Sequence, residues 1–315
     1  MMASGDIAIE LSAVVVTVRD NEAVVLCLNL PKSAGGPAFA LPSGPFAPRA
    51  HRTFDLGLRA FVSEQTGFDI GYVEQLYSFG DDDREAAIPG IDAARIISVG
   101  YLALTPDSDF RARINAAWVP FQRFFPWEDW RRGDSPPALE ALRPAFAAWC
   151  AQAATPDETE LRRRRIDILF PRDFDNWNEE RVLDRYELLY DAGLIGEARP
   201  GRDAGTAGGE VMASDHRRIL ATGLSRLRGK LKYRPVIFEL MPERFTLLEL
   251  QKSLEALSGL RLHKQNFRRG LERTGFVTPL GQLREDTGGR PAELYAYDRD
   301  RFRFSPSSGL SLPRA

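Results

Sequence analysis

The chain has 315 residues, enough for two domains, and its 43% hydrophobic and 27% charged residues are ordinary proportions for a globular protein. It contains no run of about 18 apolar residues, which excludes a transmembrane helix, and its N-terminal stretch lacks the basic start of a signal peptide. The two cysteines, Cys27 and Cys150, lie far apart in apolar settings, and the three histidines do not cluster with them. We therefore expect a cytoplasmic protein with reduced thiols and no structural zinc site.

The net charge of −2 conceals an uneven distribution of charge along the chain. Residues 214–273 contain 14 Lys and Arg against 6 Asp and Glu, a net charge of +8, which leaves −10 for the remainder. A basic module attached to an acidic body is typical of a nucleic-acid-binding protein. Charge alone does not separate this interpretation from a helical segment with a solvated basic face.

The N-terminal third of the chain predicts a compact α/β domain. Four apolar or β-branched runs predict strands, and the first two form a hairpin: 8–18, 23–29, 72–80 and 94–104. Between the second and third strands, apolar residues recur at helical spacing from Thr53 to Gln65, and Gly67 follows as a stop signal.

The middle of the chain, residues 106–200, carries less information, although two amphipathic stretches predict helices at 137–154 and 180–195. Four consecutive arginines at 162–165 favour a solvated helix end over a nucleic-acid contact. The Gly-rich stretch 198–210 has almost no apolar residues and predicts a flexible linker or a disordered loop.

The C-terminal part has clearer signals for its helices and turns. Residues 214–233 predict a helix with apolar positions on one face. Thr246 and Glu249 form the pattern of a capping box at the start of a second helix, and a short turn at 260–264 leads into a third. Two strands follow, and this order is typical of a winged helix-turn-helix.

Residues 46–68 resemble the Nudix signature, G-x5-E-x7-R-E-U-x-E-E-x-G-U, in which U is apolar. With Gly67 as the second glycine, Val62 and Phe68 take apolar positions and Glu64 takes one glutamate. The other signature positions hold different residue types: Phe46, Arg52, Ala60, Phe61 and Gln65. Gly44 lies two residues from the opening glycine, so a small insertion would restore that position.

The missing residues of the signature are the ones that its chemistry needs. A Nudix enzyme hydrolyses a diphosphate with divalent metal ions held by acids at i, i+3 and i+4, which share one helical face. Phe61, Glu64 and Gln65 occupy those positions, so one carboxylate of three remains. Phe61 and Arg52 also place bulk and positive charge where anions belong. We therefore expect no hydrolase activity, no catalytic residue and no metal site, with Glu64 as a surface or capping acid.

The segment after this helix resembles Nudix-related transcriptional regulators of NAD metabolism. In those proteins it reads approximately Y-x-E-Q-L-Y-T-F-G-x-x-x-R-D and then R-x-[VI]-S-V-x-Y. The matching residues are Gln75, Leu76, Phe79, Gly80, Arg84, Arg95, Ser98 and Tyr101. The resemblance implies an effector site formed by Gln75, Phe79, Arg84, Arg95 and Tyr101. A guanidinium fork fits phosphate oxygens, so Arg84 and Arg95 are candidate diphosphate clamps, and ion pairs with the acids at 81–85 are an equal alternative.

The C-terminal resemblance to these NrtR-like regulators is stronger and covers residues 215–297. It rests on Asp215-His216 and on the stretches FTLLELQ, NFRR and RPAELY. Within this group the chain resembles the larger alphaproteobacterial NadQ-type proteins, which also carry extra sequence between the two halves. His216 matches a fixed position of the family, and helix packing accounts for it as well as a specific role does.

The third helix of the predicted winged helix-turn-helix presents polar residues suited to DNA. Phe267 and Leu271, at i and i+4, predict its buried face. Glutamine and arginine make bidentate contacts with adenine and guanine edges in the major groove. We expect DNA contacts from this helix, from the wing and from the start of the second helix: Arg244, Thr246, Lys264, Gln265, Asn266, Arg268, Arg269, Arg284 and Arg290.

The resemblance implies a DNA-binding repressor of NAD biosynthesis or salvage genes that senses ADP-ribose or a related NAD-derived nucleotide, without a cofactor. A homodimer is expected, because two recognition helices one DNA turn apart multiply affinity. The alternative is an ADP-ribose pyrophosphatase with relocated acids, supplied by Glu74 or by the acids at 81–85. An RNA-binding protein is a weaker alternative, because nothing resembles an aromatic stacking platform.

Together these patterns predict an α/β Nudix-like domain plus a C-terminal winged helix-turn-helix domain of the α+β class, with a helical insertion between them. The expected boundaries are 1–150 for the Nudix-like effector-binding domain, 151–212 for the helical insertion and linker, 213–304 for the winged helix DNA-binding domain and 305–315 for a disordered tail.

Overall fold

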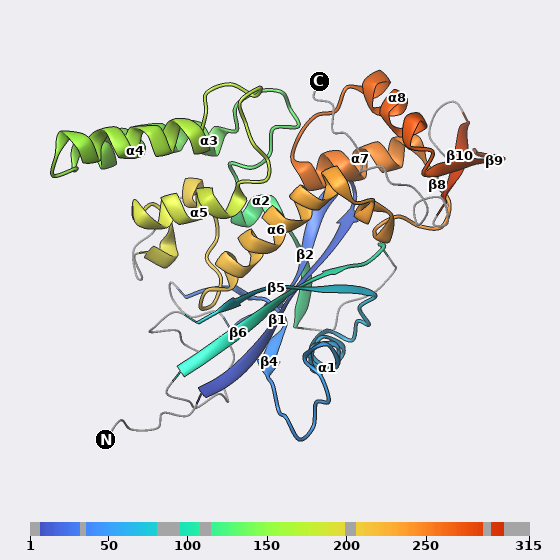
Figure 1. Cartoon of the computed structure of the whole chain (residues 1–315), viewed down its shortest axis with the longest axis horizontal. Coiled ribbons are helices and arrows are strands. Elements are labelled where there is room, and N and C mark those ends of the chain that lie inside the picture. Colours follow the sequence, from blue (N-terminus) through green and yellow to red (C-terminus); the bar gives the residue numbers. More distant parts are fainter. Residues whose placement is uncertain are drawn as a thin grey trace.

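The computed structural model describes residues 7–31, 36–80, 95–107, 115–198, 206–285 and 291–298. Within these ranges, the N-terminal strands are β1 (Ile7–Arg19), β2 (Glu22–Asn29), β3 (Phe39–Ala40), β4 (Ser43–Pro45), β5 (Tyr72–Phe79), β6 (Arg95–Leu104) and β7 (Ala116–Pro120). They form one mixed sheet in the order β3-β2-β1-β6-β5, with β4 paired to β1 and β7 paired to β2 (Figure 1).

The longest strand, β1, lies at the centre of the sheet. It is parallel to β6, with Ile7 opposite Arg95, and antiparallel to β2. Its apolar run SAVVVTV is continuous because both faces of this part of the sheet are covered. Asp20 and Asn21 have φ angles of 50° and 61°, the conformation that a two-residue type I′ turn requires. The predicted hairpin is therefore confirmed.

One face of the sheet is covered by helix α1 (Phe54–Thr66), which lies alone below the sheet in Figure 1. The Thr53 hydroxyl caps its start by accepting a hydrogen bond from the Leu56 amide at 3.2 Å, and Gly67 ends it with a φ of 75°. Leu58 and Val62 are buried against the sheet. The predicted helix and its stop at Gly67 are confirmed, and the Thr53 cap is a finding of the structure.

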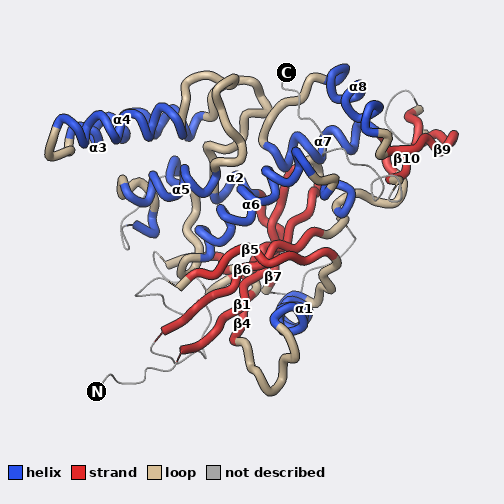
Figure 2. Tube along the Cα trace, in the orientation of Figure 1, coloured by secondary structure: helices blue, strands red, loops and turns tan. Residues whose placement is uncertain are grey.

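The opposite face of the sheet packs against several helices, and their apolar side chains form the larger core (Figure 2). The helices that contact the sheet are α2 (Phe121–Phe124), α6 (His216–Tyr233) and α7 (Leu247–Ser258), whereas α3 (Pro137–Ala151), α4 (Pro156–Leu169) and α5 (Val182–Asp191) pack mainly on one another and on α6. α3 and α4 form a hairpin that extends beyond the others (Figure 1). None of the helices in the described part of the chain is long and apolar enough to cross a membrane.

The C-terminal elements form a winged helix. α7 begins at a capping box, since the Glu249 amide donates to the Thr246 hydroxyl and the Glu249 carboxylate accepts from the Thr246 amide. Helix α8 (Lys264–Thr274) and the wing strands β9 (Val277–Arg284) and β10 (Ala292–Tyr297) follow. A two-residue strand, β8 (Phe245–Thr246), adds a third member to the wing in the order β8-β10-β9. The predicted fold class is confirmed, and β8 was not expected.

Helix α6 connects the two halves of the molecule. Predicted as the first helix of the winged helix, it also packs on β1, β5 and β6. A Cβ placed on Gly223 would lie 3.0 Å from the Val14 side chain, so the helix approaches β1 closely at this point. Its apolar face therefore covers the sheet as well as the C-terminal elements, and the predicted boundary at residue 213 stays a prediction.

Two stretches of the middle region differ from expectation. The arginine run lies inside α4, and three of its members pair with acids: Arg162 with Glu158, Arg164 with Glu160 and Arg165 with Asp191. These ion pairs favour a structural role over a nucleic-acid contact. The end of the Gly-rich stretch is also held in place, because Glu210 pairs with Arg123 at 2.6 Å. Residues 199–205 of that stretch and the predicted tail, 305–315, lie outside the described residues.

Candidate functional site

The last acid position of the Nudix signature holds a residue that binds the backbone. The Gln65 Nε2 atom donates to the Ser43 carbonyl at 2.6 Å, and its Oε1 atom accepts from the Ser43 amide at 3.1 Å. One side-chain amide therefore satisfies both backbone groups of a β4 residue. A glutamate could accept from the amide, but it could not donate to the carbonyl. Gln65 thus ties α1 to β4 where an enzyme would hold a metal ion.

Phe61, at the first of the three metal-binding positions, fills the space beside Gly44 of β4. A Cβ on Gly44 would lie 2.6 Å from Phe61 Cδ1, and the His51 ring packs edge-on against Phe61 with centroids 5.1 Å apart. Among the described residues, no three His, Cys, Asp or Glu side chains come together as metal ligands. Carboxylate ligands are what a hard divalent cation requires, so these residues do not suit a catalytic magnesium site.

The predicted effector residues that the structure describes, Gln75, Phe79, Arg95 and Tyr101, lie on β5 and β6, but they do not share one surface. The Tyr101 hydroxyl donates to Gln75 Oε1 at 3.5 Å, and burial raises the pKa of Tyr101, so the phenol stays protonated at neutral pH. The exposed Arg95 donates from Nη2 to the Gly80 carbonyl at 2.6 Å. Arg84 and the acids at 81–85 lie outside the described residues.

Phe79 is a correction to the predicted effector site. It is buried in the core on the helical side of the sheet, 4% exposed, whereas Tyr101 belongs to the core on the α1 side. The pairing of β5 with β6 shifts by a bulge between Gln75 and Ser78. A bulge turns the following side chain to the other face of the sheet. Phe79 therefore packs beneath α6 and cannot join Gln75 and Tyr101 in one cleft.

Helix α8 presents a continuous polar surface. Phe267 and Leu271 are buried, as predicted, and the remaining candidates on this helix are exposed: Lys264, Gln265, Asn266, Arg268 and Arg269. His263 caps the helix, because its Nδ1 atom accepts from the Asn266 amide at 3.5 Å. The helix therefore offers cationic and amide side chains to a partner along one exposed side.

The predicted DNA contacts outside α8 differ in their exposure and in their hydrogen bonds. Thr246 is 5% exposed and its hydroxyl is used in the capping box, so we remove it from the candidate surface. Arg284 forms an ion pair with Glu249, which fastens the wing to the start of α7. Arg244 is exposed and donates to Gln282 Oε1 at 3.1 Å. Arg290 lies outside the described residues.

Sequence patterns did not indicate the buried ionic cluster that joins the body to the winged helix. Arg185 donates to both carboxylate oxygens of Glu128, at 2.6 and 3.0 Å, and Arg228 donates to one of them. The Arg228 Nε atom also donates to the Leu257 carbonyl of α7 at 2.9 Å. Buried arginines look like surface residues in a sequence, because periodicity shows where a side chain lies only when it is apolar.

A second ionic contact joins the predicted effector strand to α6. The Lys230 ammonium pairs with Glu74 of β5, and the same carboxylate accepts from the Tyr72 hydroxyl at 2.5 Å. Glu74 precedes Gln75, so the side chain that faces the helix and the side chain predicted to face the effector are neighbours on one strand. This carboxylate is therefore engaged in packing, which weakens its candidacy as a relocated catalytic acid.

His216 has a structural role. It is fully buried, and its Nδ1 atom accepts a hydrogen bond from the Leu41 amide at 2.9 Å. The imidazole therefore joins the start of α6 to the segment before β4. Of the two explanations that the sequence left open, helix packing is the one that these contacts favour.

The Glu255 carboxylate stabilises the turn between α7 and α8. Burial alone would raise its pKa, but donors from Lys252, Gln251 and the Leu262 amide outweigh burial and hold the pKa below its ordinary value of 4.5. A folded-state pKa below the unfolded-state value gives stability that is complete above about pH 4.5 and lost as the pH falls through the folded-state pKa.

We therefore expect Glu255→Gln to reduce the acid sensitivity of the protein. The free energy of unfolding should fall less steeply between about pH 5 and pH 3 in this variant than in the wild type. Urea denaturation followed by circular dichroism at a series of pH values measures both slopes. Identical slopes would contradict the role assigned to this carboxylate.

Comparison with known proteins identifies the C-terminal part. Residues 237–297 match the family described as the NrtR DNA-binding winged helix domain. The ADPR responsive transcriptional repressor NtrR of Acinetobacter baylyi is 36% identical over 103 residues, which is 33% of this chain and 41% of the relative. The aligned stretch thus spans less than half of that relative's length.

Solved structures match the fold of the whole chain. NrtR of Shewanella oneidensis superposes with a TM-score of 0.55 at 20% identity, over 98% of this chain and 99% of that one. The same protein complexed with a 27mer DNA gives 0.54 at 19% identity, over 98% and 99% of the two chains. A MutT/nudix family protein of Enterococcus faecalis gives 0.53 at 15% identity, covering 95% of this chain and 89% of that one. Residues 237–297 are therefore similar to the NrtR winged helix family, and the chain as a whole shares the fold of the solved NrtR structure, a Nudix-like domain joined to a C-terminal winged helix.

Proposed function

We propose that this protein is a DNA-binding transcriptional repressor whose Nudix-like domain binds ADP-ribose or a related NAD-derived nucleotide without hydrolysing it. The observation that carries the proposal is the exposed row of Lys, Gln, Asn and Arg side chains on α8, within a domain of the NrtR DNA-binding family. The name of the Acinetobacter relative, an ADPR responsive transcriptional repressor, supports the same function.

The residues at the metal-binding positions of the Nudix signature support a sensor that does not hydrolyse its ligand. Gln65 is hydrogen-bonded to the Ser43 backbone and Phe61 packs against Gly44 and His51, so neither supplies a charge to a cation. A nucleotide that is bound without being hydrolysed can report its own concentration to the protein. We place the effector near Gln75, Arg95 and Tyr101, with Arg84 as a further candidate.

The contacts of α6 suggest how an effector could influence DNA binding. Lys230 pairs with Glu74, next to the proposed effector residue Gln75, and Arg228 bonds to the Leu257 carbonyl at the end of α7. A shift of β5 on effector binding would therefore act on α7 through one rigid helix. Ligands can change an equilibrium only through such differential contacts.

We further propose that the repressor is a homodimer that acts in the cytoplasm on genes of NAD biosynthesis or salvage. A dimer places two recognition helices on one operator, which raises affinity and sets the spacing of half-sites. The NAD connection follows from the proposed effector, because ADP-ribose is a fragment of NAD. Size-exclusion chromatography with light scattering tests the dimer.

The proposal is tested by a gel-shift titration on the upstream region of the protein's own gene, with ADP-ribose, NAD and ATP added separately. We expect a specific complex whose affinity changes with ADP-ribose or NAD. A parallel assay measures Mg²⁺-dependent release of AMP from ADP-ribose, which we expect to stay at background. Turnover by the wild type that disappears in Glu64→Gln would instead establish the hydrolase alternative.

We expect Arg268→Ala to weaken sequence-specific DNA binding by about 1–3 kcal/mol, because this exposed side chain of α8 would lose a bidentate contact with a base edge. Fluorescence anisotropy with labelled operator DNA measures the change. Arg163→Ala, on the exposed side of α4, removes the same charge and should leave affinity unchanged. Equal affinities for Arg268→Ala and the wild type would refute this role.

A further inference from the structure

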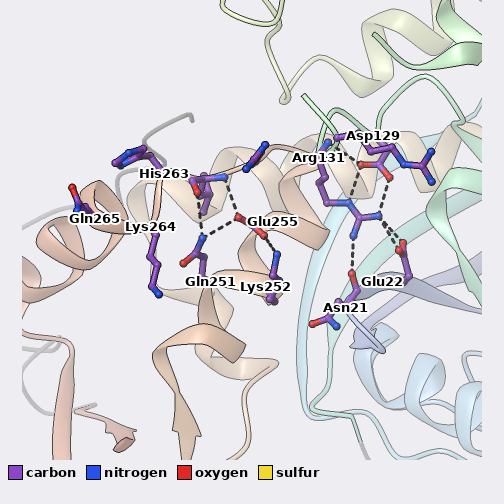
Figure 3. A pocket seen from close by; sticks show the side chains of 13 residues that line it. Asn21, Glu22, Asp129, Arg131, Gln251, Lys252, Glu255, His263, Lys264 and Gln265 are labelled. Carbon is purple, nitrogen blue, oxygen red and sulfur yellow. Dashed lines mark hydrogen bonds and ion pairs between the residues drawn. The ribbon is translucent and has the colours of Figure 1, made fainter. Parts of the chain in front are cut away.

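A polar groove lies beside the start of the recognition helix (Figure 3). It has a volume of about 820 Å³, and three parts of the chain line it. The body contributes the β1–β2 turn, with Asn21 and Glu22, and the segment 129–132 between α2 and α3. The winged helix contributes the end of α7, the following turn and the first residues of α8.

The cations in this groove fall into two groups. Arg131 is neutralised by Glu22 and Asp129, each at 2.8 Å, and Lys252 pairs with Glu255 at 2.7 Å (Figure 3). The second group consists of Arg132, Arg261 and Lys264, which are exposed and have no ion pair within the described ranges. The three acids of the groove are thus paired with Arg131 and Lys252, and with the three other cations the lining has a net charge of +2.

The segment that carries Arg132 is held firmly against the turn of the helix-turn-helix. The amide of the buried Trp130 donates to the Gly259 carbonyl at 2.7 Å. Arg131, besides its two ion pairs, donates from Nη1 to the Asn21 carbonyl at 2.7 Å. Both residues before Arg132 are therefore fixed, and its exposed side chain lines the groove. This anchoring joins a cation of the body to the DNA-proximal end of the winged helix.

We infer that Arg132, together with Arg261 and Lys264, binds the phosphate backbone of the duplex that α8 contacts. The inference rests on the proposed DNA-binding function and extends it, because Arg132 belongs to the body and lies outside the matched domain, 237–297. Duplex DNA fits the groove because Lys264 is the first residue of α8, so a duplex docked on this helix places its backbone alongside these cations. Phosphate contacts of this kind position a protein on DNA without selecting sequence.

The test compares full-length Arg132→Gln and Arg163→Gln, which remove the same charge from exposed sites on the body and on α4. Binding to labelled operator and to random-sequence duplex is measured by anisotropy between 50 and 300 mM salt, roughly the range in which counterion release dominates. For Arg132→Gln we expect a loss of roughly fivefold at physiological salt on both duplexes, and a log–log salt slope that is less negative by about 0.9. Arg163→Gln should match the wild type.

The outcomes separate this inference from the proposed function. If Arg132→Gln binds both duplexes like Arg163→Gln while Arg268→Ala still loses specificity, the inference is wrong and the proposed function stands. If the wild type binds no DNA, both are wrong. A loss confined to the operator would also overturn the inference, because it would make Arg132 a base-selective residue. Thermal melts by circular dichroism verify that the variants are folded.

Discussion

Replacing Glu128 with glutamine is expected to lower the free energy of unfolding by about 3–5 kcal/mol. Glu128 is 3% exposed, and it is the carboxylate to which the buried guanidinium groups of Arg185 and Arg228 both donate. Glutamine removes the counterion of both buried cations and turns one acceptor into a donor, so Arg185, which donates to both carboxylate oxygens, would face an amide nitrogen in either orientation. A buried ion pair adds little stability compared with apolar residues of similar volume. Removing one partner is much more destabilising, because the remaining charge stays desolvated and unpaired.

The matched control is Glu160→Gln, which removes an equivalent charge from the exposed Arg164–Glu160 pair on α4. Exposed pairs at i, i+4 contribute about 0.3–0.5 kcal/mol. Chemical denaturation at neutral pH measures both variants against the wild type. If both variants lost the same small amount of stability, the cluster around Glu128 would have to be open to water, and its role in joining body and winged helix would fail.

Gly259→Ala is expected to destabilise the protein by at least about 2 kcal/mol and to weaken DNA binding. Gly259 ends α7 with a φ of 71°, a conformation that L-residues rarely adopt. A Cβ there would lie 2.2 Å from the Glu128 carbonyl oxygen, a backbone atom that cannot rotate away. The turn would have to separate from the segment that ends in Arg132, and the Trp130–Gly259 hydrogen bond would be lost.

Gly270→Ala provides the contrast, because Gly270 lies within α8 and a Cβ there would meet no atom within 4 Å. Alanine in a helix interior is favoured over glycine by about 0.5–1 kcal/mol, so this variant should be slightly more stable than the wild type. Urea denaturation gives the two stabilities, and anisotropy gives the affinity of Gly259→Ala for operator DNA. A Gly259→Ala protein as stable as Gly270→Ala would show that the body and the turn are not in contact in solution.

The sequence by itself determined those features that depend on neighbours within one helical turn or one hairpin. The Asp20–Asn21 turn, the Gly67 helix stop and the capping box of Thr246 and Glu249 are all local, and each is where the residues predict it. The loss of two of the three metal-binding acids of the signature, at Phe61 and Gln65, is likewise visible without coordinates. The buried and exposed sides of α8 follow from periodicity, because a helix places i and i+4 on one face.

The tertiary structure decided where those elements meet. Period-2 alternation along β5 would place Gln75 and Phe79 on one face, and the bulge between Gln75 and Ser78 separates them; nothing in the sequence marks a bulge that depends on pairing with β6. The partners of Arg185 and Arg228 come from distant segments, so their burial was not predictable from local pattern. The position of Arg132 beside α8 also depends on residues that are far apart in sequence, because the Trp130 amide donates to the Gly259 carbonyl. Local propensity specifies elements, whereas contacts between distant residues assemble the site.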